Sequence, residues 1–136
     1  MTDNNSRAAR HIAPVLQVAD VRAALDYYRR VLGFEEEFVW GDPPQYGMVG
    51  RDHQAEVHFS LKSPVRDHSI LYLTVPDADA YHAEVAARGA KVLNPPADQP
   101  YRMREFAVED PDGHRLFIGS RLEEKSGPLL PPAPAK

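Results

Sequence analysis

Hydrophobic residues recur every three or four positions in two stretches of the chain, which is the spacing of one face of an α-helix. In the first stretch, 21–32, Leu25, Tyr28 and Leu32 form an apolar stripe. The second stretch covers 78–88. An aspartate that can cap a helix precedes each stretch, and a glycine that can end a helix follows it. The pattern therefore predicts two helices.

Short runs in which apolar and polar residues alternate follow and precede these helices and predict β-strands. Turn-forming Gly, Asp and Pro residues separate several of the runs. The predicted strands cover 14–18, 34–40, 46–50, 56–61, 70–75, 91–93, 104–108 and 115–118. Strands and helices together predict an α+β fold.

The strand-to-helix junction occurs twice, as Val18-Ala19-Asp20 and as Val75-Pro76-Asp77, 57 positions apart. Each junction is followed by a helix and three strands, which indicates an internal duplication of a strand–helix–three-strand unit. One such unit alone would leave a whole sheet face exposed and is too small for a stable core. We therefore expect two paired units.

The pattern predicts a single domain at 11–121, with one module at about 11–61 and a second at about 68–119. Residues 1–10 carry no periodic pattern, and we expect them to form a flexible arm. The Pro-rich residues 122–136 are expected to form a flexible tail.

Alternation also assigns strand residues to the two faces of a sheet. One face is apolar and is expected to pack under the helices: Leu16, Val18, Val57, Phe59, Leu61, Leu71, Leu73, Val75, Leu116 and Ile118. The other face is mixed and aromatic: Ala13, Val15, Gln17, Glu56, His58, Ser60, Ile70, Tyr72, Thr74, Arg115 and Phe117. A face of this composition suits the lining of a cup.

The 136-residue chain has the hydrophobic (43%) and charged (26%) content of a globular protein. It contains no cysteine, which excludes disulfides, thiolate metal sites and cysteine nucleophiles. A formal charge of −4 gives no basic footprint for a phosphate backbone, so we do not expect nucleic acid as a partner. No apolar run approaches the ~20 residues that span a bilayer, and the first ten residues are polar. We expect no membrane partner and a cytoplasmic location.

Three features in order resemble the glyoxalase/bleomycin-resistance/extradiol-dioxygenase (vicinal oxygen chelate) superfamily. They are the helix end Tyr27-Tyr28-Arg29-Arg30-Val31-Leu32-Gly33-Phe34, the two Val-x-Asp junctions, and the turn Asp110-Pro111-Asp112-Gly113-His114. The resemblance covers about 11–119. It implies paired βαβββ modules whose mixed sheets curl round a cup, and a homodimer with the ligand crevice between subunits. It also implies, for the enzymes of the superfamily, a divalent metal held from four inward positions.

Three of those four positions carry residues that cannot bind a metal. Ala13 and Ile70 stand seven residues before Asp20 and Asp77, and Phe117 stands four residues after the glycine of the late turn. The fourth position keeps a ligand type, His58. One imidazole does not make a metal site, which generally needs three protein ligands. We expect no metal and no other cofactor, and we assign no catalytic residue.

The metal-free pattern is similar to the bleomycin-resistance branch, which binds a drug without changing it. The segments 46–52, 57–60 and 104–107 match that branch in spacing and residue type. Tyr101-Arg102-Met103 departs from it by replacing the usual Trp-Gly. We expect sequestration of an aromatic, cationic antibiotic of the bleomycin type. The alternatives are a glyoxalase- or dioxygenase-like enzyme, and a protein that holds a biosynthetic intermediate.

Aromatic residues and one histidine are the candidates for ligand contact: Phe38, Trp40, His58, Tyr72, Tyr101 and Phe117. Rings of this kind stack on planar and cationic groups, and the alternative is ordinary packing. His58 can bond a ligand or satisfy a buried neighbour. The other histidines, His11, His53, His68, His82 and His114, are expected to be exposed.

Overall fold

The computed structural model describes residues 9–122. The two helices and eight strands expected from the sequence all occur within this range. In chain order they are β1 (Val15–Val18), α1 (Val21–Arg30), β2 (Glu35–Trp40), β3 (Tyr46–Arg51), β4 (Ala55–Leu61), β5 (Ile70–Thr74), α2 (Ala78–Ala87), β6 (Lys91–Asp98), β7 (Met103–Glu109) and β8 (Arg115–Arg121). The flexible arm and tail expected at the two ends fall largely on residues 1–8 and 123–136, outside the described residues.

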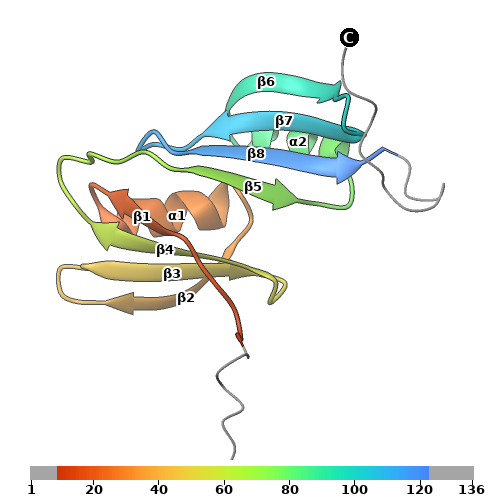
Figure 1. Cartoon of the computed structure of the whole chain (residues 1–136). Helices are drawn as coiled ribbons and strands as arrows, with labels where there is room; N and C mark the ends of the chain where they lie inside the picture. The colour runs from red at the N-terminus through yellow and green to blue at the C-terminus, as the bar shows by residue number, and fades with distance from the viewer. Residues whose placement is uncertain (1–8, 123–136) are drawn as a thin grey trace, which may run out of the picture.

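The strands form two sheets of the same topology, in the orders β1-β4-β3-β2 and β5-β8-β7-β6. In each sheet the first strand runs parallel to the last strand of its module, and the other neighbours are antiparallel. This repeated order confirms the duplication and the α+β fold. Figure 1 shows the second sheet above the first, with both helices behind the strands.

The helix ends follow the expected capping chemistry. The Asp20 carboxylate accepts a hydrogen bond from the Ala23 amide at 3.0 Å, and the Asp77 carboxylate accepts one from the Ala80 amide at 3.0 Å. Such caps satisfy amide groups that have no partner within the helix. Gly33 and Gly89 follow the helices with φ of 82° and 97°, a left-handed conformation that favours glycine.

Strand β6 is longer than the pattern predicted. The alternation ends at Leu93, but the strand continues through Asn94, Pro95 and Pro96 to Asp98. Two irregularities shift its register against β7 in this region. Proline donates no ladder hydrogen bond. The two prolines are tolerated here because β6 lies at the edge of its sheet.

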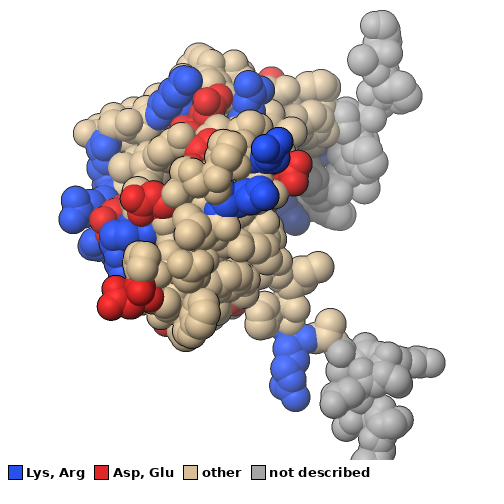
Figure 2. Space-filling view, turned by 90° about the vertical axis from the view of Figure 1, so that its left-hand side faces the viewer, with Lys and Arg blue, Asp and Glu red and all other residues tan. Residues whose placement is uncertain are grey.

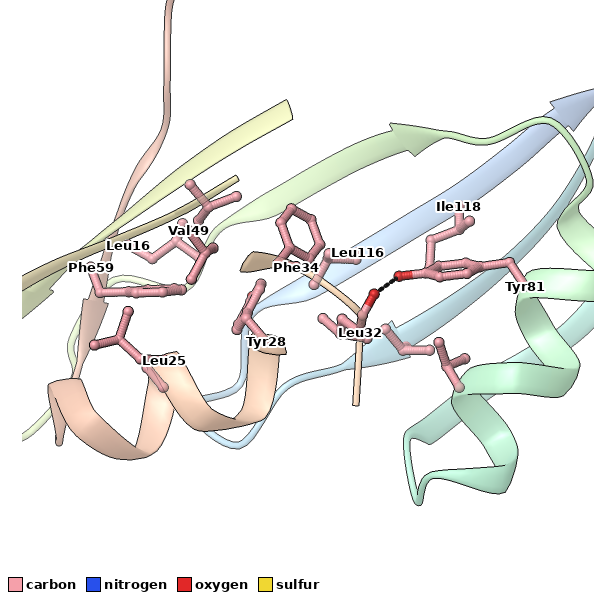
Figure 3. Packing of buried hydrophobic residues seen from close by; sticks show 14 of the residues in the cluster. Leu16, Leu25, Tyr28, Leu32, Phe34, Val49, Phe59, Tyr81, Leu116 and Ile118 are labelled. Carbon is pink, nitrogen blue, oxygen red and sulfur yellow. Dashed lines mark hydrogen bonds between the residues drawn. The ribbon is translucent and has the colours of Figure 1, made fainter. Parts of the chain in front are cut away.

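Residues from both modules form one hydrophobic core under the sheets (Figure 3). Leu25, Tyr28 and Leu32 of the predicted stripe are each at most 1% exposed. Across the module boundary, the Tyr81 hydroxyl of α2 donates to the backbone carbonyl of Leu32. The two helices therefore pack on the same side of the two sheets, and the opposite sheet faces stay open.

The predicted helix-side face is largely buried, with exceptions at strand ends and at the seam. Leu61 is 37% exposed, so its assignment to the core is wrong; it is the last residue of β4. Leu71 and Leu73 are half-buried beside the seam between the sheets. On the open side Val15, Ile70 and Tyr72 are 53%, 70% and 50% exposed.

The expectation that His114 is exposed is wrong, because its side chain is fully buried. Its Nε2 lies 2.7 Å from the carbonyl oxygen of Gln17 in β1, and its Nδ1 accepts from the Ser69 amide at 2.9 Å. The ring therefore joins the first module, the connection between modules and the late turn. His82 is half-buried against the Phe106 ring, which also departs from the expectation.

Asp110 shapes the same turn. Its carboxylate is buried and accepts hydrogen bonds from the Tyr28 hydroxyl at 2.7 Å and from the amides of Asp112 and His114 at 2.9 Å. Burial raises the pKa of this carboxyl, while these hydrogen bonds oppose the shift. Asp110 therefore organises the turn and the module boundary.

Neither helix within 9–122 is long and apolar enough to cross a membrane. The face seen in Figure 2 carries Lys and Arg side chains interspersed with Asp and Glu. The cytoplasmic location and the absence of a nucleic-acid partner stay predictions.

Candidate functional site

The open face of the first sheet carries two rows of paired residues that run across its strands. One row is Phe38, Met48, His58 and Val15, and the next is Trp40, Tyr46, Ser60 and Gln17. Residues directly opposite each other in a ladder share a face. Trp40 and Phe38 are 61% and 46% exposed. Both rings therefore stand over the open face.

A hollow of about 420 Å³ lies beside these rows. Its walls include both rings and the Tyr46 phenol, and its full lining is Phe38, Trp40, Gln45, Tyr46, Ser60 and Leu61. The hollow offers two flat apolar surfaces and several hydrogen-bonding groups, which is the usual make-up of a small-molecule site.

His58 is held between two partners on this face. Its Nδ1 lies 2.7 Å from the Tyr46 hydroxyl oxygen, and its Nε2 lies 2.7 Å from a Glu56 carboxylate oxygen. An ionised carboxylate only accepts, so the Glu56 contact places a proton on Nε2. When the ring is neutral, Nδ1 then accepts the Tyr46 proton. Glu56 also meets the His11 ring at 3.4 Å.

A second cluster lies on the open face of the other sheet, around Glu105. Glu105 is only 7% exposed. Each of its carboxylate oxygens accepts a hydrogen bond at 2.6 Å, one from the Tyr72 hydroxyl and one from the Tyr101 hydroxyl. Phe117 pairs with Tyr72 across the adjacent strands and shares this face. The cluster therefore contains three of the residues expected from the sequence.

The hydrogen bonds to Glu105 help to raise the pKa of both tyrosines. The pKa of Tyr101 is raised to about 12, chiefly by its hydrogen bond to Glu105. The pKa of Tyr72 is raised by burial and by the same carboxylate. Both phenols therefore keep their protons at neutral pH.

Gly119 allows Tyr72 to reach Glu105. Tyr72 is on β5 and Glu105 is on β7, so the phenol must cross β8, where Gly119 stands between them. A Cβ atom at this position would collide with the Tyr72 hydroxyl. A hollow of about 410 Å³ lies next to the cluster, lined in part by Tyr101, Glu105 and Phe117.

The six candidate residues thus divide between the two sheets. Phe38, Trp40 and His58 lie on the first, and Tyr72, Tyr101 and Phe117 lie on the second. A third hollow, of about 390 Å³, lies at the seam between the sheets. Glu56 and Tyr72 both line it, so it borders both groups.

Two residues of these clusters, Tyr46 and Glu105, were not predicted from the sequence. The alternation that assigned β4 to its two faces also applies to β3 and β7, and it would have placed both residues on the open side. A glutamate on a strand is ordinarily solvated, however, and nothing local reveals that two tyrosines converge on it.

The residues present do not fit the divalent metal of the superfamily's enzymes. Ala13, Ile70 and Phe117 offer no ligand atom, and both ring nitrogens of His58 already have partners. Within 9–122, no group of three or more His, Asp or Glu side chains is arranged to hold a metal ion.

The comparison with known proteins agrees with this fold. A sequence model of the glyoxalase/bleomycin resistance protein/dioxygenase superfamily matches residues 9–118. The chain belongs to this superfamily. The match spans both modules.

Solved structures of the superfamily share the architecture. A member from Sphaerobacter thermophilus is 26% identical, with a TM-score of 0.72 over 84% of this chain and 98% of that chain. A bleomycin-binding protein from bleomycin-producing Streptomyces verticillus, in complex with copper(II)-bleomycin, is 27% identical, with a TM-score of 0.64 over 82% of this chain and 95% of that chain.

A curated relative is the protein CFP32 of Mycobacterium bovis, which is named as a candidate glyoxylase. It is 34% identical over 93 residues, or 66% of this chain. The match spans 36% of the length of CFP32. The relatives of this superfamily member thus include both a binding protein and a protein named for an enzyme.

Proposed function

We propose that this superfamily member binds and sequesters a planar, cationic small molecule of the bleomycin type without changing it chemically. The observation that carries the proposal is the exposure of large rings on the open sheet faces. Trp40, Tyr72 and Phe38 are about half exposed or more, although burying such rings is favourable. A stacked ligand would cover them, and each ring pair adds about 0.5–1.5 kcal/mol beyond the buried area.

The charge of the open faces supports a cationic ligand. Glu56 on the first sheet and Glu105 on the second both point to the open side, and the whole chain carries a net charge of −4. Acidic side chains near aromatic walls attract and hold a cation. The bleomycin-binding relative from Streptomyces verticillus, at 27% identity, supports the same ligand class.

The proposed site includes a second copy of the chain. The two clusters of a single chain lie on separate sheets, and the hollows beside them open to solvent. Pairing two chains so that the open faces meet would enclose a ligand between the rings of both. We therefore propose a homodimer with an intersubunit crevice, in which the six candidate residues contact the ligand.

One observation favours an enzyme instead. The series Tyr46, His58 and Glu56 resembles the arrangement of a base that a carboxylate orients, and it needs no metal. In that case Tyr46 would exchange protons with a bound substrate. Turnover of a bound compound, rather than its tight retention, separates this candidate from sequestration.

Titration of the tryptophan fluorescence with bleomycin tests the proposal. Trp40 is the single tryptophan of the chain, so its emission reports the site directly. We expect saturable quenching by bleomycin and by copper(II)-bleomycin, in protein that metal analysis shows to be free of iron, manganese, nickel and zinc. No change in emission up to millimolar bleomycin, or stoichiometric metal that survives dialysis, would contradict the proposal.

A further inference from the structure

The Glu105 cluster has a feature that stacking does not use. Glu105 is largely buried as a residue, yet the two hydrogen bonds of its carboxylate come from neutral phenols. Within 9–122, no ion pair joins this carboxylate to a Lys, Arg or His. The neighbouring Arg104 is directed elsewhere, with hydrogen bonds to Asp79 at 2.9 Å and to Asp98 at 2.8 Å. A buried carboxylate without a cation is costly unless a further partner compensates it.

The two phenols have a fixed hydrogen-bonding role. Tyr72 and Tyr101 each give their single proton to Glu105, and their raised pKa values agree with retention of those protons. A phenol oxygen whose proton is committed can only accept further hydrogen bonds. The cluster therefore presents a negative charge and two acceptor oxygens, and no hydroxyl donor.

The surroundings suit a small charged head beside an apolar body. The adjacent hollow of about 410 Å³ is lined by Tyr101, Glu105, Phe117, Pro95 and Ala97, among others. The Phe117 ring adds a π surface, which attracts cations. An anionic group would meet the Glu105 charge and find no hydroxyl donor on either tyrosine.

We propose that Glu105, Tyr72 and Tyr101 form a subsite for an ammonium or amidinium group that donates hydrogen bonds. The inference rests on the proposed function and deepens it. It assigns the cationic group of the ligand to the second sheet, while the planar part stacks on Phe38 and Trp40. The ammonium group donates to the phenol oxygens and is balanced by the carboxylate behind them.

Three probes that differ only in their polar group test the subsite: 2-naphthylmethylammonium, 2-naphthylmethanol and 2-naphthoate. Calorimetric titration at neutral pH gives their affinities. Hydrogen bonds to charged groups contribute enough that we expect the ammonium probe to bind about tenfold more tightly than the alcohol. We expect the carboxylate probe to bind more weakly than both.

Conservative variants connect this preference to the cluster. Glu105→Gln keeps the shape and removes the charge, so we expect the ammonium and alcohol probes to bind it about equally. Tyr101→Phe should reduce the preference in part, and this exposed position allows the test even if Glu105→Gln fails to fold. Tyr27→Phe removes a phenol oxygen from α1, far from the open faces, and serves as the matched control with an unchanged preference.

Equal binding of the ammonium and alcohol probes to the wild-type protein would overturn the inference. An ammonium preference that is unchanged in Glu105→Gln would also overturn it. If Glu105→Gln is unfolded, an unchanged preference in Tyr101→Phe has the same consequence. Failure of all three probes to bind would overturn it as well. The bleomycin titration judges sequestration separately. Bleomycin binding without a cation preference among the probes would leave sequestration standing and remove the subsite.

Discussion

Trp40 lies on the open face with 61% of its surface exposed, so it contributes little to the core. We expect Trp40→Ala to lower the free energy of unfolding by about 1 kcal/mol or less, against about 3–5 kcal/mol for a core aromatic. The same change should weaken bleomycin binding severalfold, because it removes a stacking surface. Denaturant midpoints and calorimetric titrations on one preparation measure both effects.

Phe34 provides the matched control for this substitution, because it is only 3% exposed and packs in the core. Phe34→Ala should show the large loss of stability. A core-sized loss for Trp40→Ala, with unchanged affinity per folded molecule, would move Trp40 out of the site.

Tyr27 has a buried hydroxyl for which the described residues provide no hydrogen-bond partner. Burial raises the pKa of this phenol to about 12. An unpaired buried hydroxyl costs free energy, so we expect Tyr27→Phe to leave the free energy of unfolding unchanged or to raise it by up to about 1 kcal/mol. A lower denaturant midpoint would show that the hydroxyl has a partner after all.

At the residue scale, alternation placed His58, Tyr72 and Phe117 on the open faces, because direction in a strand follows from position alone. It could not show which polar residues meet there. Glu105 meets Tyr72 only because the phenol crosses β8 at Gly119, and this contact requires three strands to lie side by side. Burial of His114 likewise depends on Gln17, which is distant in sequence.

Among the elements, the turn between β7 and β8 joins the two modules through His114. We expect His114→Ala to lower the free energy of unfolding by about 2–4 kcal/mol, because it leaves a cavity and removes the partner of the Ser69 amide. His53→Ala, in an exposed turn, is the control and should change stability little. Equal denaturant midpoints for the two variants would contradict this role of the turn.

Most element boundaries could be predicted from the sequence, because caps and alternation are local signals. Strand β8 runs three residues past its expected end at Ile118, and strand β6 departs furthest from the expectation. Its continuation through Pro95 and Pro96 depends on its place at the edge of the sheet, where a missing donor costs little, and no local pattern reveals which strand lies at an edge.

For the whole molecule, the main expectation is that two chains pair, and the structure of one chain does not test it. The open faces carry exposed apolar residues such as Val15 and Ile70, which a partner would cover. We expect sedimentation equilibrium at micromolar concentration to give twice the chain mass of 15.2 kDa. A monomer at this concentration would contradict the intersubunit crevice.

The number of modules, and the strand–helix–three-strand succession along each, followed from the duplication and the superfamily resemblance, whereas the order of strands within each sheet was not predicted. How the modules meet could not be predicted from the residues, because no strand pairs across the seam. The contacts there are single side chains, such as Tyr81 on Leu32, which have no sequence pattern.

Sequestration without turnover is tested most directly by the mass of the ligand after contact with the protein. Bleomycin in molar excess is incubated with dialysed, metal-free protein, and bound and free fractions are separated and measured by mass spectrometry. We predict that the bound amount saturates with the protein sites and that bleomycin keeps its mass in both fractions. A change of mass in more bleomycin molecules than there are protein chains would show catalysis and contradict sequestration.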